Sequence, residues 1–230
     1  MRKLMALEMK KFKMKTYVLA SVISCFVLIA FTYFISVVSV VEKDPVFQSY
    51  HNIFKFVGIM SMIIFIILSS VMHSRITIED YIGKKLILLF SYPKGRKNVF
   101  IAKICLVTLF TVIALIGSSG ACLVIFSITE SIFPIVPDTL TLSFFLSTLQ
   151  TILLTALIVG ALSILAMAAG FIKKSTPTTI VTSFALAATI GNLTMNSNSS
   201  IGLVLLGILI VLDVLVMKVL TKKVNEMDAI

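Results

Sequence analysis

The sequence predicts an all-α integral membrane protein with six transmembrane helices and with both ends of the chain in the cytoplasm. Three observations lead to this prediction. Of the 230 residues, 59% are hydrophobic and only 13% are charged, which leaves too little polar surface to cover a water-soluble domain of this size. The apolar residues form long continuous runs without alternation, which favours helices over the strands of a membrane barrel. Finally, nearly all Lys and Arg residues lie in four of the segments that separate those runs.

The N-terminal segment, residues 1–16, is basic and is predicted to be an amphipathic helix that lies on the membrane surface. Its candidate contacts with anionic lipid head groups are Lys10, Lys11, Lys13 and Lys15. The apolar run that follows, Tyr17 to Val41, is longer than the roughly 7–15 apolar residues of a cleavable signal peptide. It is therefore interpreted as a retained span.

Six apolar runs are long enough to be spans, because an α-helix needs about 20 residues to cross about 30 Å of hydrocarbon. The predicted spans are Tyr17 to Val41, Phe54 to Met72, Ile104 to Ile128, Leu140 to Ile172, Pro177 to Met195 and Ile201 to Met217. Ser, Thr, Gly and Ala dilute the fifth run, and the fourth is long enough to include a kink or an interfacial piece. The transmembrane domain is expected over residues 17–217, followed by a cytoplasmic tail over residues 218–230.

The orientation follows from the distribution of positive charge. Of the 20 Lys and Arg residues, only Lys43 and Lys55 lie outside the four basic segments. Those segments precede the first span and follow the second, the fourth and the sixth. Since Lys and Arg are enriched in cytoplasmic connections, both termini and these connections are predicted to be cytoplasmic. The net charge of +10 is thereby explained by membrane topology, and no nucleic-acid partner is expected.

The connection between the second and third spans, residues 73–103, is far longer than the roughly 2–8 residues that usually join neighbouring helices. It mixes apolar with charged residues, which predicts short amphipathic helices at the membrane surface. The stretch Tyr92-Pro93-Lys94-Gly95-Arg96 predicts a turn, because Pro93 fixes one backbone dihedral angle and Gly95 can adopt a positive one.

This connection resembles that of the type-2 ATP-binding-cassette (ABC) permeases. The resemblance rests on Glu79 and Gly83, an apolar patch over residues 86–89, the Tyr92-Pro93-x-x-Arg96 turn, and Lys103 before the next span. It implies that the connection carries a coupling helix, which docks in a cleft of a separate ATPase subunit, and that residues 1–16 form an interface helix. The implied ATPase contacts are Glu79, Asp80, Gly83, Lys84, Tyr92, Pro93 and Arg96. Lys84 stands where the family usually has Thr or Ser, and residues 192–200 are shorter than the re-entrant piece that often precedes its last span.

The same resemblance implies a multi-pass permease of a bacterial cytoplasmic membrane, which pairs with a second copy or a similar chain. Its length and short outer connections are similar to those of small bacterial permeases for the export of, or immunity to, peptide antibiotics and lantibiotics. ATP and Mg²⁺ are expected on the partner subunit, because this chain has no G-x-x-x-x-G-K-[ST] motif. No cofactor or catalytic residue is assigned to this chain, and its three cysteines lack the spacing of a metal site.

Asp213 lies well inside the sixth predicted span, where a charged group is costly and often functional. It is a candidate for an intramembrane ion pair with Lys218, or for a proton or cation relay. The alternative function is therefore an ion-coupled secondary transporter, for which the polar residues 175–179 are a second hint. An intramembrane enzyme is disfavoured because His51 and His73 lie near opposite faces and the spans hold no acidic pair. A membrane-embedded assembly or sensor subunit remains open.

Overall fold

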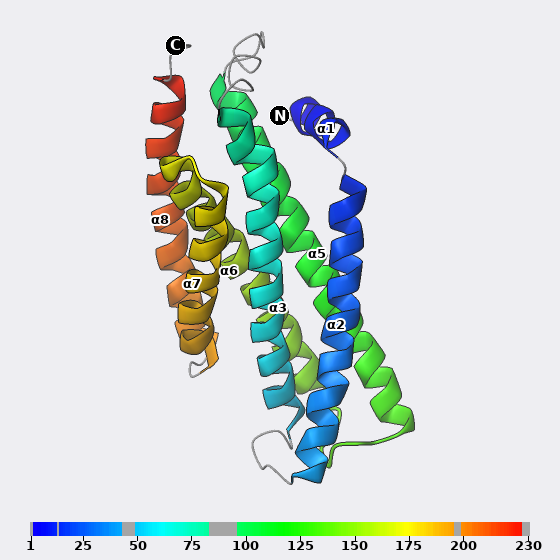
Figure 1. Ribbon diagram of the computed structural model, residues 1–230. Helices are drawn as coiled ribbons and strands as arrows, with labels where there is room; N and C mark the ends of the chain where they lie inside the picture. Colours follow the sequence, from blue (N-terminus) through cyan, green and yellow to red (C-terminus); the bar gives the residue numbers. More distant parts are fainter. Residues whose placement is uncertain (1, 13, 43–48, 83–95, 196–198, 227–230) are drawn as a thin grey trace.

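The computed structural model describes residues 2–12, 14–42, 49–82, 96–195 and 199–226, which fold into seven α-helices and two short helical turns (Figure 1). The helices are α1 (Arg2–Lys11), α2 (Met14–Val41), α3 (Tyr50–His73), α5 (Arg96–Ile132), α6 (Leu142–Lys173), α7 (Thr176–Met195) and α8 (Ser199–Asn225). After α3 come the π-helical turn η1 (Ser74–Ile78) and the 3-10 turn η2 (Glu79–Tyr81). None of the described residues lies in a strand. The predicted all-helical class is therefore confirmed.

Five of these helices are long and apolar enough to cross a membrane by length and composition: α2, α3 with its two turns, α5, α6 and α8. Helix α7 has 20 residues, but Thr, Ser, Gly and Asn interrupt its apolar surface, and it is not among the five. The chain thus has the architecture of a multi-pass membrane protein. A sixth crossing through α7 stays a prediction.

Helices α3 and α6 form the centre of the bundle. Helix α3 packs against α2, α5, α6 and α7, and α6 packs against α5, α7 and α8 as well. Helices α2 and α8 lie on opposite flanks and leave most of their apolar side chains exposed (Figure 1). Exposed apolar side chains are what lipid-facing helices require, because the surrounding acyl chains are apolar too.

Close helix packing depends on small residues at two places. A methyl group at Gly160 would lie 3.2 Å from Cγ2 of Val112, so α5 approaches the backbone of α6 there. At Gly170, a methyl group would lie only 1.8 Å from Oγ1 of Thr179 on α7. Helix α6 then ends at Lys174, whose positive φ of 47° lets the Ser175 amide donate to the Gly170 carbonyl at 3.0 Å. Gly170 therefore serves both the α6–α7 contact and the end of α6.

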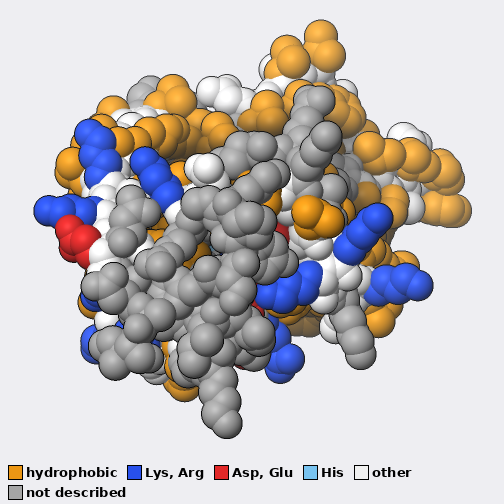
Figure 2. All heavy atoms as spheres, turned by 90° about the horizontal axis from the view of Figure 1, so that it is seen from above, with side chains coloured by type: hydrophobic (Ala, Val, Ile, Leu, Met, Phe, Trp, Pro, Cys, Tyr) orange, Lys and Arg blue, Asp and Glu red, His pale blue; other side chains and the backbone are white. Residues whose placement is uncertain are grey.

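One end of the bundle carries α1, the ends of α3 and α8, and the start of α5 (Figure 1). We call it the basic end, because Lys and Arg side chains surround its face in Figure 2. Among the described side chains, its exposed cations are Lys10, Lys11, Lys15, Arg75, Lys97, Lys173, Lys174, Lys218, Lys222 and Lys223. This segregation of charge is what the predicted cytoplasmic side requires. The orientation itself remains a prediction.

At the opposite end, Glu130 of α5 fixes the connection that leads to α6. Its Oε1 accepts hydrogen bonds from the amides of Ile135 and Val136, at 2.8 and 2.7 Å, and from the Tyr50 hydroxyl at 2.8 Å. The Tyr50 amide, at the start of α3, donates to Oδ2 of Asp138 at 3.0 Å. The start of α3 and the α5–α6 connection are thereby held together.

Candidate functional site

Helix α1 lies against the basic end and divides into a buried and an exposed face. Leu4 is buried in an apolar cluster with Val99 and Phe100 of α5, whereas Lys10 and Lys11 are exposed. Glu8 is the unusual residue, since its carboxylate is on the buried side and its residue is only 6% exposed. A buried carboxylate needs a counter-charge or hydrogen-bond donors, and α5 supplies a cation.

Lys103 of α5 is that cation, and it is fully buried, with 0% exposure. Its ammonium group donates to Oδ2 of Asp80 on η2 and to the carbonyl of Ile76 on η1, the latter at 3.1 Å. It also lies 3.5 Å from Oε2 of Glu8. One side chain therefore connects α1, α5 and both turns that follow α3.

Lys11 adds a second link between α1 and η2. Its ammonium group donates to Oδ2 of Asp80 at 2.7 Å, and the side chain of Lys11 is 46% exposed. Both ammonium groups also lie over the ring of Phe12, that of Lys11 at 5.2 Å and that of Lys103 at 5.4 Å from the ring centre. We call Glu8, Lys11, Asp80 and Lys103 the ion network.

In the ion network, two carboxylates, Glu8 and Asp80, face two cations, Lys11 and Lys103. Buried charges in proteins need such opposite charges beside them. Moving each charge out of water costs several kcal/mol, so Lys103 is tolerated only because Asp80, Glu8 and the Ile76 carbonyl surround it. Removal of one partner would leave the others buried without compensation. The network thus favours a single arrangement of α1, α3 and α5.

An aromatic cluster holds η2 on its other side. The Tyr81 ring meets Phe100 of α5 and Phe171 of α6 edge-on, with ring centres 5.4 and 5.3 Å apart. The two Phe rings lie 5.1 Å from each other. Short π-helical turns such as η1 occur frequently at functional sites. Here η1 and η2 carry the chain from the end of α3 into contact with α1, α5, α6 and α7.

The predicted ATPase contacts differ in their burial, and four of them lie outside the described residues. Asp80 is only 4% exposed and already paired inside the chain, so its carboxylate connects helices of this chain instead of facing outward. Glu79, on the same turn, is half-buried. Arg96 is the first residue of α5. Gly83, Lys84, Tyr92 and Pro93 lie outside the described residues, as does Lys13 among the predicted lipid contacts.

The contacts of Glu8 and Lys103 inside the chain were not predicted from the sequence. Glu8 is the one acidic residue in a segment rich in Lys, and Lys103 stands at the start of an apolar run. The available signals were the negative charge of Glu8 among cations and the position of Lys103 beside a predicted span. Neither signal identifies a partner, since Lys103 and Asp80 are 23 positions apart and Lys11 and Asp80 are 69 apart.

Asp213 lies on α8 and is buried, with 8% exposure, and its Oδ1 has no hydrogen-bond partner among the described residues. No ion pair between Asp213 and Lys218 is present in the described part of the chain, and Lys218 is exposed. Across the described ranges, no group of three or more His, Cys, Asp or Glu side chains could hold a metal ion. The predicted pair of Asp213 with Lys218 is therefore not formed in this structure.

The sequence is similar to those of known proteins over most of its length. The sequence pattern described as "ABC-2 family transporter protein" matches residues 4–189, a range that contains all four residues of the network. The "Uncharacterized protein YcbO" of Bacillus subtilis (strain 168) is 24% identical over 189 residues, which are 82% of this chain and 83% of YcbO. No solved structure matches the chain.

Proposed function

Because the chain belongs to the ABC-2 family of transporter proteins, we propose that it is the membrane permease subunit of an ATP-driven exporter. A separate ATPase subunit binds the basic end and carries ATP and Mg²⁺. The cargo is a hydrophobic or amphipathic molecule, with antimicrobial peptides as the leading class. Membership of the family and the run of long apolar helices support the transport role, and the ion network supports the mechanism of coupling.

The observation that carries the proposal is the connection of Asp80 with Lys103. The chain leaves η2 at Tyr81 and enters α5 at Arg96, so the proposed coupling segment is attached to these two elements. The buried pair joins the two attachment points directly, and Lys11 and Glu8 add α1 to the same unit.

Such a unit transmits displacement because it resists deformation. A push on residues 83–95 moves α1, α3 and α5 together, since relative motion of these helices would separate buried charges at a cost of several kcal/mol. Helices α3 and α5 both contact α6 along the bundle. Closure of the ATPase subunits is thereby converted into a shift of the spans.

Capture of the tagged chain from its native membrane in mild detergent tests the partner. We expect an ATPase subunit with a nucleotide-binding site to copurify with the wild type, and to be lost from Glu79→Lys combined with Arg96→Glu. The matched control is Glu42→Lys, which reverses an exposed charge directly after α2, at the end of the bundle opposite the basic end, and should retain the partner. A wild-type chain that brings down no nucleotide-binding protein would falsify the proposal.

A dimer completes the proposed exporter. Gly117 and Ala121 are spaced one turn apart on α5, and a methyl group at Gly117 would meet nothing within 4 Å. That position can accept a helix of a second copy, because small residues allow backbones to approach closely. Disulfide formation between copies that carry Gly117→Cys, in a background without other cysteines, tests this contact. Cross-linking at Val181→Cys instead, on α7, would place the interface elsewhere.

Ion-coupled secondary transport is the second candidate, and Asp213 favours it. A buried carboxylate with an unpartnered oxygen inside a spanning helix suits a proton or cation site. Transport that continues without ATP hydrolysis, collapses with the ion gradient and is lost in Asp213→Asn would support this candidate over the exporter.

A further inference from the structure

A cavity of about 470 Å³ lies between α3 and α6, at the end of the bundle opposite the ion network. The last residues of α7 and the first residues of α8 supply its remaining wall through Thr194 and Gly202. Its volume falls within the roughly 300–1,000 Å³ of pockets that bind small molecules. Nothing in the proposed coupling mechanism uses this space.

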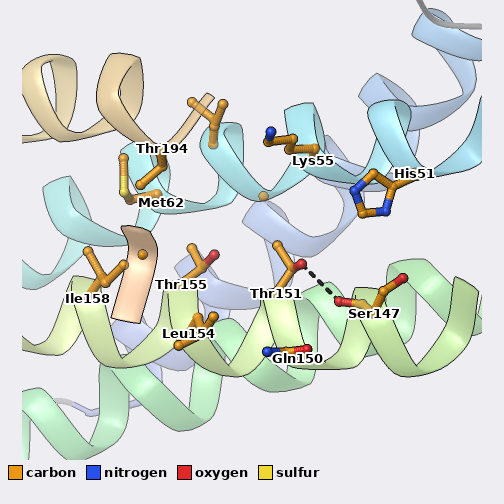
Figure 3. Close-up of a pocket in the computed structure, with 13 residues that line it drawn as sticks. His51, Lys55, Met62, Ser147, Gln150, Thr151, Leu154, Thr155, Ile158 and Thr194 are labelled. Atoms are coloured by element: carbon orange, nitrogen blue, oxygen red, sulfur yellow. Dashed lines mark hydrogen bonds between the residues drawn. The ribbon is translucent and has the colours of Figure 1, made fainter. Parts of the chain in front are cut away.

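The lining changes from polar to apolar along the cavity. His51 and Lys55 are one turn apart on α3 and lie across from Ser147 and Gln150 on α6 (Figure 3). Further along both helices, the lining becomes mostly apolar, with Met62 on α3 and Leu154 and Ile158 on α6, and Thr194 of α7 lies beside Met62 (Figure 3). Because α3 and α6 run in the same direction, the polar residues of both helices are at the same level, near the helix starts.

Thr151 and Thr155 of α6 line the middle of the cavity. The Thr151 hydroxyl donates to the Ser147 carbonyl at 2.9 Å, as the dashed line in Figure 3 marks. Its methyl group is left to contact a ligand. The absence of a side chain at Gly58 keeps this part of the cavity open, since a methyl group there would lie 3.9 Å from Cγ2 of Thr151 and 3.9 Å from the hydroxyl oxygen of Thr155.

The distance over which the cavity lining changes from polar to apolar is close to the thickness of one leaflet of a bilayer. From His51 to Met62 the helix rises about 16 Å, at 1.5 Å per residue, which is close to half of the roughly 30 Å of hydrocarbon. If the start of α3 lies at the membrane surface, the polar end of the cavity lies at the level of the head groups and its other end near the bilayer centre. An acyl chain has the same dimensions and the same order of polarity, whereas a folded peptide does not.

Charge selects the sign of the head group. Lys55 contributes a cation to the polar end, and no Asp or Glu is among the described residues that line the cavity. We propose that this cavity binds one acyl chain of an anionic amphiphile, with its charged group at Lys55 and its chain between α3 and α6. This inference does not rest on the proposed ATP-driven export, because the isolated chain is sufficient to test it.

Photolabelling in phosphatidylcholine vesicles tests the site. The purified chain is reconstituted, exposed to palmitate that carries a diazirine in its acyl chain, irradiated and mapped by peptide mass spectrometry. We expect labels to concentrate on the peptides that contain Met62 and Leu154 to Ile158. In Lys55→Gln, labelling should fall about fivefold, the ratio expected for the loss of one partly exposed ion pair.

Three variants separate the site from general effects on the fold. Lys55→Arg keeps the cation and should retain the labels, whereas Gly58→Leu occupies the cavity and should abolish them. Lys218→Gln removes an exposed cation of α8 that does not line the cavity, and should label like the wild type. Each variant is compared with the wild type by its thermal unfolding midpoint.

Two further probes define the ligand. A hexadecyltrimethylammonium ion with the same diazirine carries the opposite charge and should not label the cavity. Photoactivatable phosphatidylglycerol distinguishes the source, since labelling by it indicates a membrane phospholipid and labelling by palmitate alone indicates a single-chain ligand. Labels spread evenly over the lipid-facing helices, or equal labelling by the cationic probe, would overturn the proposal.

Discussion

The ammonium group of Lys103 forms a buried ion pair with the carboxylate of Asp80, which joins the start of α5 to the turn that follows α3. Lys103 has no exposed surface, and its other neighbours are the Ile76 carbonyl and the carboxylate of Glu8. The arrangement makes the basic end a single mechanical unit, and its contribution can be measured.

Lys103→Met is expected to lower the free energy of unfolding by about 3–5 kcal/mol, because Asp80 and Glu8 lose the cation that compensates their burial. Adding Asp80→Asn should recover part of this loss, since it removes one of the orphaned charges. The measurement is denaturant unfolding of the four variants of the cycle in detergent. Additive effects of the two substitutions would show that Lys103 and Asp80 do not interact.

Glu130→Ala is expected to destabilise the end opposite the ion network. It leaves the amides of Ile135 and Val136 and the Tyr50 hydroxyl without their shared acceptor, and each buried donor left unpaired costs about 1–3 kcal/mol. Tyr50→Phe removes only the hydroxyl that donates to Glu130, at 2.8 Å, and to the Val136 carbonyl, at 3.4 Å, and should cost less. The control is Glu226→Ala, which breaks an exposed pair with Lys222 and should leave the thermal midpoint nearly unchanged.

Gly170→Ala is expected to separate α6 from α7. The new methyl group would lie 1.8 Å from Oγ1 of the fully buried Thr179 and 2.8 Å from Cδ1 of Ile78. A forced shift of this kind costs about 1–3 kcal/mol. Gly207→Ala on α8 is the matched control, because nothing lies within 4 Å of the new group. Equal thermal midpoints for the two variants would contradict the packing described here.

Single-cysteine labelling tests the sixth crossing. In a chain whose three native cysteines are replaced by Ala, Lys174→Cys and Asn192→Cys place thiols at the two ends of α7. If α7 spans the membrane, a membrane-impermeant maleimide added to intact cells should label Asn192→Cys and leave Lys174→Cys unlabelled until the cells are broken. Identical labelling of both sites would reduce the chain to five spans.

Several features could be predicted from sequence because they depend on local composition. The predicted second span, Phe54 to Met72, lies within α3, and the predicted third span, Ile104 to Ile128, lies within α5. Both helices extend beyond the predicted bounds, since helix formation continues past the hydrocarbon into the polar segments. The resemblance of the chain to ABC permeases is confirmed at the level of the family. The ATPase contacts and the dimer remain proposals.

The role of Asp80 could not be predicted in this way. Its neighbour Glu79 and its position in a charged loop indicated contact with a partner, but its carboxylate is paired with Lys103 and Lys11. Hydrophobic patterning does not distinguish a charge that faces a partner from one that a second helix covers. Only the position of α1 against α5 decides between them.

The helical structure of this protein and its place in a membrane follow from its amino-acid pattern, because continuous apolar runs in lipid must satisfy their backbone hydrogen bonds within each helix. The segregation of Lys and Arg, which predicts the orientation, is likewise visible without a folded structure. The tertiary structure alone decided which charges are buried and which residues line the cavity between α3 and α6. Those outcomes depend on contacts between residues far apart in the chain, and burial changes the energy of a charge only once another helix has excluded water from it.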